Sequence, residues 1–285
     1  MTLRSISSDP AQPKPARRDL RSFEVRSRGS SKRLGTVHDA LVDDEGRTRY
    51  LCVAEPGSDR HVLLPAGEAD ADRDESIVWV AHDDLVGSLP DWSHAAAAPD
   101  EELERRIEAQ CDAAYDGDRW HDRAEYRGGS WSAGTGGAAT GKLERLDSWS
   151  EYTVARDDPD PRGWAVSGDD GRMLGTVDTL IGDTGSMRVV YLAVKLIHHV
   201  DPSGRTVLIP AGVVDLDVDR RRVIARGFDA DCVAGLPRWS GRAITDDDAK
   251  AVILACDRIY TGARRYEHPR FRDDGLGDAS RPAVW

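Results

Sequence analysis

The stretch VLLPAG at residues 62–67 returns as VLIPAG at residues 207–212, and LGTV at residues 34–37 returns as LGTV at residues 174–177. Three shorter matches keep the same order: Tyr50-Leu51 with Tyr191-Leu192, Leu89–Trp92 with Leu236–Trp239, and Cys111 and Tyr115 with Cys256 and Tyr260. The offset between matched residues drifts only from 140 to 147. The chain is therefore a duplication of one module with small loop insertions.

The local pattern within each copy indicates β-strands. Val189–Val194 is a run of β-branched and aromatic residues with the length of a strand. Polar and apolar residues alternate at the end of Val213–Val218, so we expect Val214, Leu216 and Val218 to face a core. Short strands separated by Gly, Asp and Pro favour a small antiparallel barrel or sandwich in each copy. The fold class predicted is mainly β.

Each copy also ends in a predicted helix. Thr245 followed by three aspartates is typical of a helix N-terminus, where acidic residues oppose the positive end of the helix. Apolar residues then follow at helical spacing from Ala249 to Ile259, and Gly262 is expected to end the helix. In the first copy Pro99–Glu102 begins a helix with a thinner apolar stripe, which we expect to pack more weakly.

These patterns predict two small domains with connecting and terminal segments. The predicted boundaries are a disordered basic arm over 1–19, a first repeat with its helix over 20–117, a glycine-rich linker over 118–145, a second repeat with its helix over 146–262, and a tail over 263–285. We expect each copy to fold on its own. The second should be the more stable, because its strands and helix carry more β-branched and apolar residues.

Composition excludes several classes of protein. No run approaches the roughly 20 apolar residues that cross a bilayer, and the start of the chain does not resemble a secretory signal, so we expect a cytoplasmic protein. The four cysteines form no Cys-x-x-Cys pair, which argues against a zinc knuckle or a dithiol redox motif. Nucleophile-elbow, phosphate-loop and His-Glu-x-x-His motifs are absent, so we expect no catalytic residues and no cofactor.

The charge is distributed unevenly. Residues 1–33 carry nine Lys/Arg and three Asp/Glu, residues 34–117 carry 6 and 21, and residues 174–262 carry 11 and 12. The two copies thus share a sequence pattern but differ in the charge that they carry. Arg17, Arg18 and Arg21 of the basic arm are candidates to contact RNA or anionic lipid, or else to lie against the acidic first repeat.

These residues resemble the PRC-barrel domains found in the cytoplasmic part of the photosynthetic reaction-centre H subunit and in a ribosome-maturation factor. The resemblance rests on these positions: Gly35, Asp39, Tyr50, Pro65 and Gly67 in the first copy, and Gly175, Asp178, Tyr191, Pro210 and Gly212 in the second. It extends in the second copy over Val154–Val166 and Phe228–Tyr260. The H subunit has an amino-terminal membrane helix and one barrel, whereas this chain has no such helix and two copies.

The resemblance implies a docking module with protein partners, which can include a membrane-bound complex and would place the protein at the periphery of the inner membrane. An RNA- or ribosome-associated factor and a stress protein are the alternatives. Trp92 and Trp239 are candidates to anchor a partner, although capping of the barrel is the favoured interpretation. His198 and His199 with Asp201 suggest a metal site, but a turn is the favoured interpretation there. No metal is therefore expected.

Overall fold

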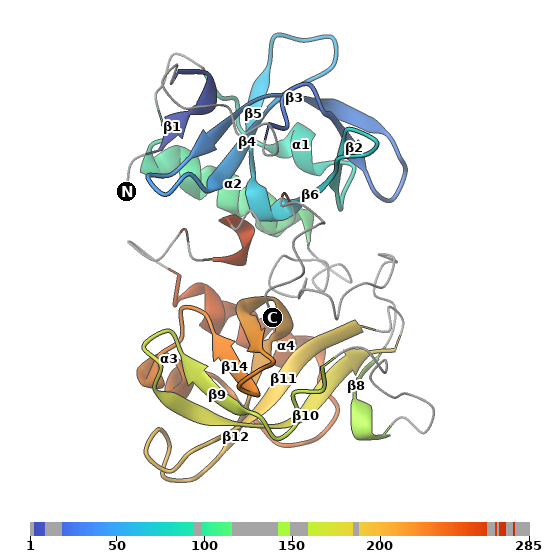
Figure 1. The fold of residues 1–285 in the computed structure, drawn as a ribbon. Helices are drawn as coiled ribbons and strands as arrows, with labels where there is room; N and C mark the ends of the chain where they lie inside the picture. Colours follow the sequence, from blue (N-terminus) through green and yellow to red (C-terminus); the bar gives the residue numbers. More distant parts are fainter. Residues whose placement is uncertain are drawn as a thin grey trace. The chain divides into compact units, whose positions relative to one another are not determined.

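The structure is a computed structural model that describes residues 3–8, 19–93, 98–115, 142–148, 159–184, 188–260, 266, 268–271 and 276. The chain divides into two compact units. The first comprises residues 1–120 and 270–281, and the second comprises residues 121–269 and 282–285. Each unit contains a strongly curled sheet with helices beside it (Figure 1). The predicted mainly β class, with a helix after each sheet, is confirmed.

The first unit is built on a seven-stranded sheet. Its strands are β1 (Arg4–Ser5), β2 (Glu24–Ser27), β3 (Arg33–Val42), β4 (Thr48–Ala54), β5 (His61–Pro65), β6 (Ala69–Asp72) and β7 (Ile77–Val80). Its helices are α1 (Leu85–Ser88), α2 (Glu101–Ala114) and the 3-10 turns η1 (Ile6–Ser8) and η2 (Ala66–Glu68). The strand order is β5-β4-β3-β2-β7-β6, and β1 also pairs with β3. Only the β2–β7 pair is parallel among these described strands.

The second unit repeats this topology with eight strands. They are β8 (Leu143–Arg145), β9 (Ala165–Gly168), β10 (Met173–Asp183), β11 (Arg188–Leu196), β12 (Thr206–Pro210), β13 (Val214–Asp217), β14 (Arg222–Ala225) and β15 (Arg238–Trp239). The helices are η6 (Leu146–Ser148), η7 (Ala211–Val213), α3 (Ala230–Gly235) and α4 (Asp246–Asp257). The order β13-β14-β9-β10-β11-β12-β15 reproduces the first sheet and adds β15 at its edge. The duplication seen in the sequence is a duplication of the sheet.

The repeated glycines lie where two long strands approach closely. A methyl group at Gly35 on β3 would lie 2.7 Å from the carbonyl oxygen of Ala54, and one at Gly175 on β10 would lie 2.5 Å from that of Lys195. Both distances are shorter than a carbon atom tolerates, so only glycine fits. Pro65 likewise precedes η2 with φ −58°, and its counterpart in the second unit precedes η7 with φ −60°. These glycines and prolines therefore occupy equivalent places in the two sheets.

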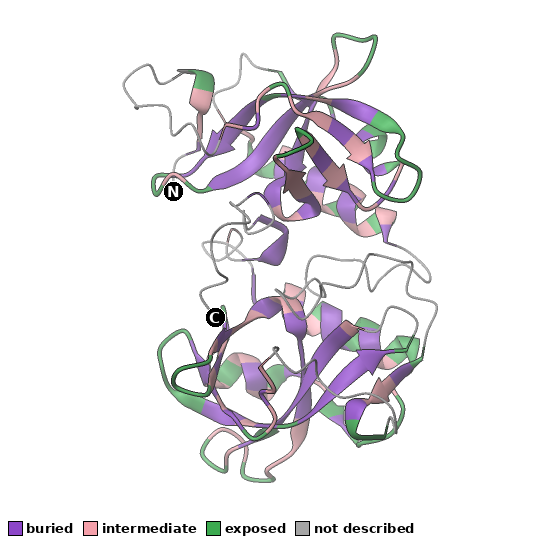
Figure 2. Cartoon of the chain, turned by 45° about the vertical axis from the view of Figure 1, so that its right-hand side comes forward, coloured by how far each residue is buried: buried purple, intermediate pink, exposed green. Residues whose placement is uncertain are grey.

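The core of each unit lies between the inner face of its sheet and its longest helix. Figure 2 shows that the strands are buried along most of their length. Ile107 and Cys111 bury one side of α2, and Val252 and Cys256 bury one side of α4. Leu216 is buried as predicted, but Val218 is 38% exposed because it falls in the turn after β13.

Both long helices begin as the sequence predicts. The Thr245 hydroxyl accepts a hydrogen bond from the Asp248 amide, and the Asp248 carboxylate accepts one from the Thr245 amide. This capping box satisfies two amides at the helix N-terminus. In the first unit the Asp100 carboxylate accepts from the Leu103 amide. Helix α4 ends at Asp257, before the predicted stop at Gly262, which lies outside the described residues.

Three short segments differ from the predicted boundaries. Residues 4–8 of the predicted disordered arm form β1 and η1, and β8 falls inside the predicted linker. Leu3, just before β1, and Leu143, the first residue of β8, are each 6% exposed. Within the predicted tail, Pro269–Phe271 forms a 3-10 turn. These segments are too short to show the alternation of apolar residues that marks a strand or helix in the sequence. Each is held in place by the burial of one or two side chains.

Candidate interaction site

The structure places the repeated motif residues in the cores of the two units, where they build the fold. Tyr50 and Tyr191 are both 0% exposed, on the central strands β4 and β11. Pro65 and Pro210 are also buried, whereas Gly67 and Gly212 are half-buried in the 3-10 turns that follow. These tyrosines, prolines and glycines lie at equivalent places in the two units, and none of them is exposed.

Asp39 and Asp178, which follow the Gly-Thr-Val of each copy, do not occupy equivalent places in the two sheets. A β-bulge separates Val37 from Asp39 in the β3–β4 pairing, and the matching bulge in the second unit separates Val177 from Thr179. Asp39 therefore corresponds to Thr179 and is 3% exposed, whereas Asp178 occupies the exposed bulge position.

The residue after the bulge is linked in both units to the short segment beside it, β1 and η1 in the first and η6 in the second. The Asp39 carboxylate accepts hydrogen bonds from the Ser5 hydroxyl and the Ser7 amide. In the second unit the direction is reversed, because the Thr179 hydroxyl donates to Asp147 at 2.8 Å. Hydrogen bonds from Arg145 and Thr179 lower the pKa of Asp147 to about 2, although burial opposes this shift. The same contact is thus kept with its donor and acceptor exchanged.

The two candidate anchor tryptophans are buried. Trp92 is 7% exposed and Trp239 is 8% exposed. The indole N–H of Trp239 donates to the Arg242 carbonyl at 2.9 Å, and the Arg145 guanidinium lies 5.8 Å from its ring centre. Little of either ring is available to a partner, as expected of residues that cap a barrel.

The described basic residues near the start of the chain pair within the first unit. Arg21 contacts Asp19 at 2.5 Å, and Arg28 contacts Asp70 at 3.0 Å. A hydrogen bond from its guanidinium to the Asp19 carboxylate raises the pKa of Arg21, with burial acting against it. Arg17 and Arg18 lie outside the described residues. Arg21 and Arg28 therefore lie against acidic residues of the first unit.

The histidine loop after β11 is a turn. The Gly204 amide donates to the Asp201 carbonyl at 2.9 Å, and the Asp201 carboxylate contacts Arg205 at 2.8 Å. His198 Nδ1 lies 3.1 Å from the Pro202 carbonyl oxygen. Across the described part of the chain, no group of three His, Cys, Asp or Glu side chains is arranged to hold a metal ion.

A cluster of buried charges lies between η2 and α2 of the first unit. Glu68 is 0% exposed, and its carboxylate accepts from the Tyr115 hydroxyl at 2.5 Å and from Arg270 Nε at 3.3 Å. The other end of the Arg270 guanidinium contacts Asp112 at 2.5 Å. Arg270 is 5% exposed. An arginine from the end of the chain therefore neutralises a carboxylate in the core of the first repeat.

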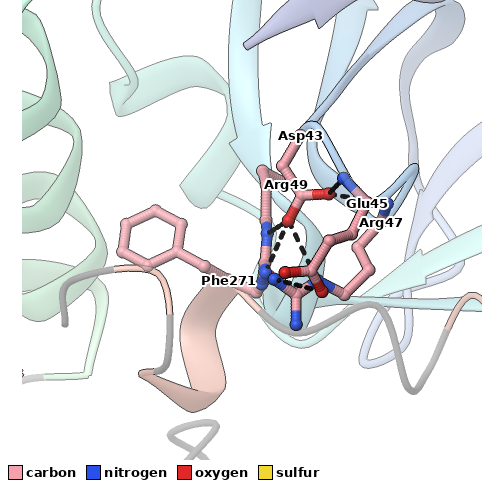
Figure 3. Close-up of polar contacts among 5 residues, drawn as sticks. All are labelled: Asp43, Glu45, Arg47, Arg49 and Phe271. Carbon is pink, nitrogen blue, oxygen red and sulfur yellow. Dashed lines mark hydrogen bonds and ion pairs between the residues drawn. The ribbon is translucent and has the colours of Figure 1, made fainter. Parts of the chain in front are cut away.

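The next residue, Phe271, is held by a second buried ion pair. Its ring meets that of Tyr50 edge to face at 5.5 Å, and its carbonyl oxygen accepts from Arg49 at 2.9 Å. The Asp43 carboxylate forms an ion pair with Arg49, with 2.8 Å between Oδ2 and Nη2. It also accepts hydrogen bonds from the Arg47 amide and side chain (Figure 3). Burial favours the neutral form of Asp43, but these hydrogen bonds outweigh it and lower its pKa.

Two buried thiols of the first unit are poor nucleophiles. Burial, with a contribution from Asp39, raises the pKa of Cys52 to about 12. Burial and the Glu68 carboxylate raise the pKa of Cys111 well above its ordinary value. Both thiols therefore stay protonated at neutral pH, and neither is suited to attack a substrate.

Comparison with known protein families agrees with the duplicated fold described above. The model of the PRC-barrel domain matches residues 16–84 and residues 155–231, which together span 146 of the 285 residues. The chain belongs to the PRC-barrel family. The first match covers β2 to β7 and ends just before α1, and the second covers β9 to β14 and ends at the start of α3, so the fold contains two tandem PRC barrels. PRC-barrel domains are in general non-catalytic.

The helices α2 and α4 and the segment around Arg270 lie outside the PRC-barrel matches. In the described residues no helix is long and apolar enough to cross a membrane. The charged cluster of the first PRC barrel was missed by sequence reasoning. One signal for it was available: PAGE at residues 65–68 replaces PAGV at residues 210–213, so an acid stands where the other copy has a core valine.

Proposed function

We propose that this protein is a non-enzymatic adaptor whose two PRC barrels dock different protein partners. The observation that supports this proposal is a reversal of charge at equivalent hairpins. The β6–β7 turn carries Arg73, Asp74 and Glu75, a net charge of −1, whereas the β13–β14 turn carries Asp219, Arg220 and Arg221, a net charge of +1. The strands beside these turns pair in the same register, so the backbone is kept while the net charge of the turn changes sign. Surfaces of opposite charge select different partners.

The net charges of the two copies differ in the same sense as the two turns, with the first copy the more acidic. Residues 34–117 have a net charge of −15 and residues 174–262 have a net charge of −1. A component of a membrane-bound complex, such as a photosynthetic reaction centre, is the partner class that the resemblance to the H subunit favours. The acidic surface of the first barrel disfavours nucleic acid.

The proposal is tested by capture of partners with the tagged full-length chain after mild crosslinking. The baits are the wild type, Asp74→Arg with Glu75→Arg, and Arg220→Glu with Arg221→Glu. Asp59→Arg is the control, because Asp59 is exposed outside these hairpins. Each hairpin variant should lose its own set of captured proteins while its circular dichroism is unchanged.

Identical captured sets from all baits would contradict the adaptor proposal. Recovery of RNA or ribosomal proteins that are lost at high salt would instead move the function to the basic arm. A bait with Arg17, Arg18 and Arg21 changed to Glu separates that outcome, since only nucleic-acid binding through the arm would then disappear. If none of the baits captures a specific partner, the stress-protein alternative is favoured.

A further inference from the structure

The contacts made by the segment around Arg270 have the form of peptide recognition. Two side chains enter the first repeat: Arg270 between Glu68 and Asp112, and Phe271 against Tyr50. Both are nearly or fully buried, at 5% and 1% exposure. A guanidinium between two carboxylates and an aromatic ring beside a tyrosine select these two side chains by charge and shape.

The backbone of the same segment is held by arginines of the barrel. Arg49 donates to the Phe271 carbonyl at 2.9 Å, and Arg73 donates to the Leu276 carbonyl at 2.8 Å. Leu276 is itself 4% exposed. Carbonyl contacts accept any residue, whereas the side-chain sites do not. Such a division between general backbone contacts and specific side-chain sites is how extended peptides are recognised.

These recognition groups are not required by the barrel itself. By the alignment of the two copies, the second has Val213 where the first has Glu68, and Val190 where the first has Arg49. Both valines are buried, Val190 on β11 and Val213 in η7, in a unit whose sheet has the same topology. The PRC-barrel fold therefore does not need charged residues at these two positions. In the first copy, Glu68 and Arg49 instead hold the segment around Arg270.

We infer that the first repeat carries a peptide-binding site for an arginine followed by an aromatic residue, and that its own C-terminal segment occupies this site. The partner is a protein segment with that chemistry, drawn to a repeat with a net charge of −15 over residues 34–117. This inference names a site and a ligand for the docking role proposed above and rests on it. A partner binds by competing with the chain's own segment, whose covalent attachment gives it an effective concentration on the order of millimolar.

The test uses the full-length chain with its own segment disabled by Arg270→Glu and Phe271→Ala. The probe is a fluorescent synthetic peptide of residues 266–279, and the control probe is the same peptide with Glu at the position of Arg270. The disabled chain should bind the probe at least about tenfold more tightly than the wild type, because the site is then empty. The control probe should bind neither chain. Equal, weak binding of the probe to a folded disabled chain and to the wild type would overturn the inference.

A second measurement covers the case in which the disabled chain does not fold. Excess unlabelled peptide added to the wild-type chain should increase deuterium uptake in residues 266–281, since it displaces the resident segment. Unchanged uptake at saturating peptide would overturn the inference. Because this test involves no cellular partner, its failure leaves the hairpin-dependent capture experiment standing, and the two proposals fail separately.

Discussion

Replacing Glu68 by glutamine isolates the charge of the buried cluster, because the two side chains have the same shape. The amide oxygen of Gln can still accept from the Tyr115 hydroxyl, now at 2.5 Å from the carboxylate. The Arg270 guanidinium, however, loses one of its two carboxylates and keeps Asp112. Breaking a buried ion pair from one side costs about 3–5 kcal/mol, and with one partner retained we expect about 2–3 kcal/mol.

The loss is measured by native-state hydrogen exchange of α2 and β5, which reports on the first unit alone. A loss of about 2–3 kcal/mol corresponds to opening that is about 30 to 150 times more frequent. Glu75→Gln is the control, because Glu75 is exposed on the same sheet; its effect should stay within about 0.5 kcal/mol. If Glu68→Gln behaves like this control, the ion pair does not stabilise the first repeat and the reasoning is refuted.

A compensated variant distinguishes charge from packing. Glu68→Val, Tyr115→Phe and Arg270→Leu together replace the polar cluster by apolar side chains, as the second copy does at Val213. Replacing a whole buried ion pair by apolar groups is often neutral or stabilising. We therefore expect the triple variant to recover most of the stability lost in Glu68→Gln. A triple variant as unstable as the single one would show that shape, not charge, determines the effect.

Three further outcomes are expected. Gly35→Ala should lower the free energy of unfolding of the first unit by about 1–3 kcal/mol in urea, because its methyl group would meet a backbone carbonyl at 2.7 Å, whereas Gly87→Ala, with open space around it, should not destabilise it. Thr245→Ala should cost about 1 kcal/mol in the second unit by loss of the capping box, and an unchanged urea midpoint would contradict that role. The folded-state pKa of Asp43 is lowered, so its stabilisation is present at neutral pH and is lost as the pH falls from about 4 through that lower pKa; Asp43→Asn should flatten this part of the acid titration.

The repeated core of the fold could be predicted from the sequence because each signal was local. Val189–Val194 lies within β11 (Arg188–Leu196), and the alternation after Val213 became β13. The capping box at Thr245 needs only four consecutive residues. Whether a segment forms a strand, and where a helix begins, depends mainly on residues that are close in the sequence. The sequence alone therefore contains the information needed to predict both.

The alignment of the two copies could have placed Asp39 from the sequence alone: at the offset of 140 set by the LGTV repeat, Asp39 aligns with Thr179 and His38 with Asp178, and matching β-bulges lie there in both sheets. The buried cluster could not be predicted, because its contacts are not local. The contact between Glu68 and Arg270 spans 202 residues, and an arginine in a polar tail is ordinarily exposed. No local pattern distinguishes such an arginine from a solvated one.

The comparison of the two copies shows how the duplication allowed them to diverge. Positions that fix strand geometry, such as Gly35 and Gly175, kept their residue because only one side chain fits. Glu68 in the core is different, since a buried carboxylate is costly unless a cation accompanies it. Its presence ties the first repeat to Arg270, at the far end of the sequence, while the second repeat, with valine at that position, has no such need. The first copy therefore depends on an occupant that another protein can imitate, and that dependence makes it the one suited to a regulated partner.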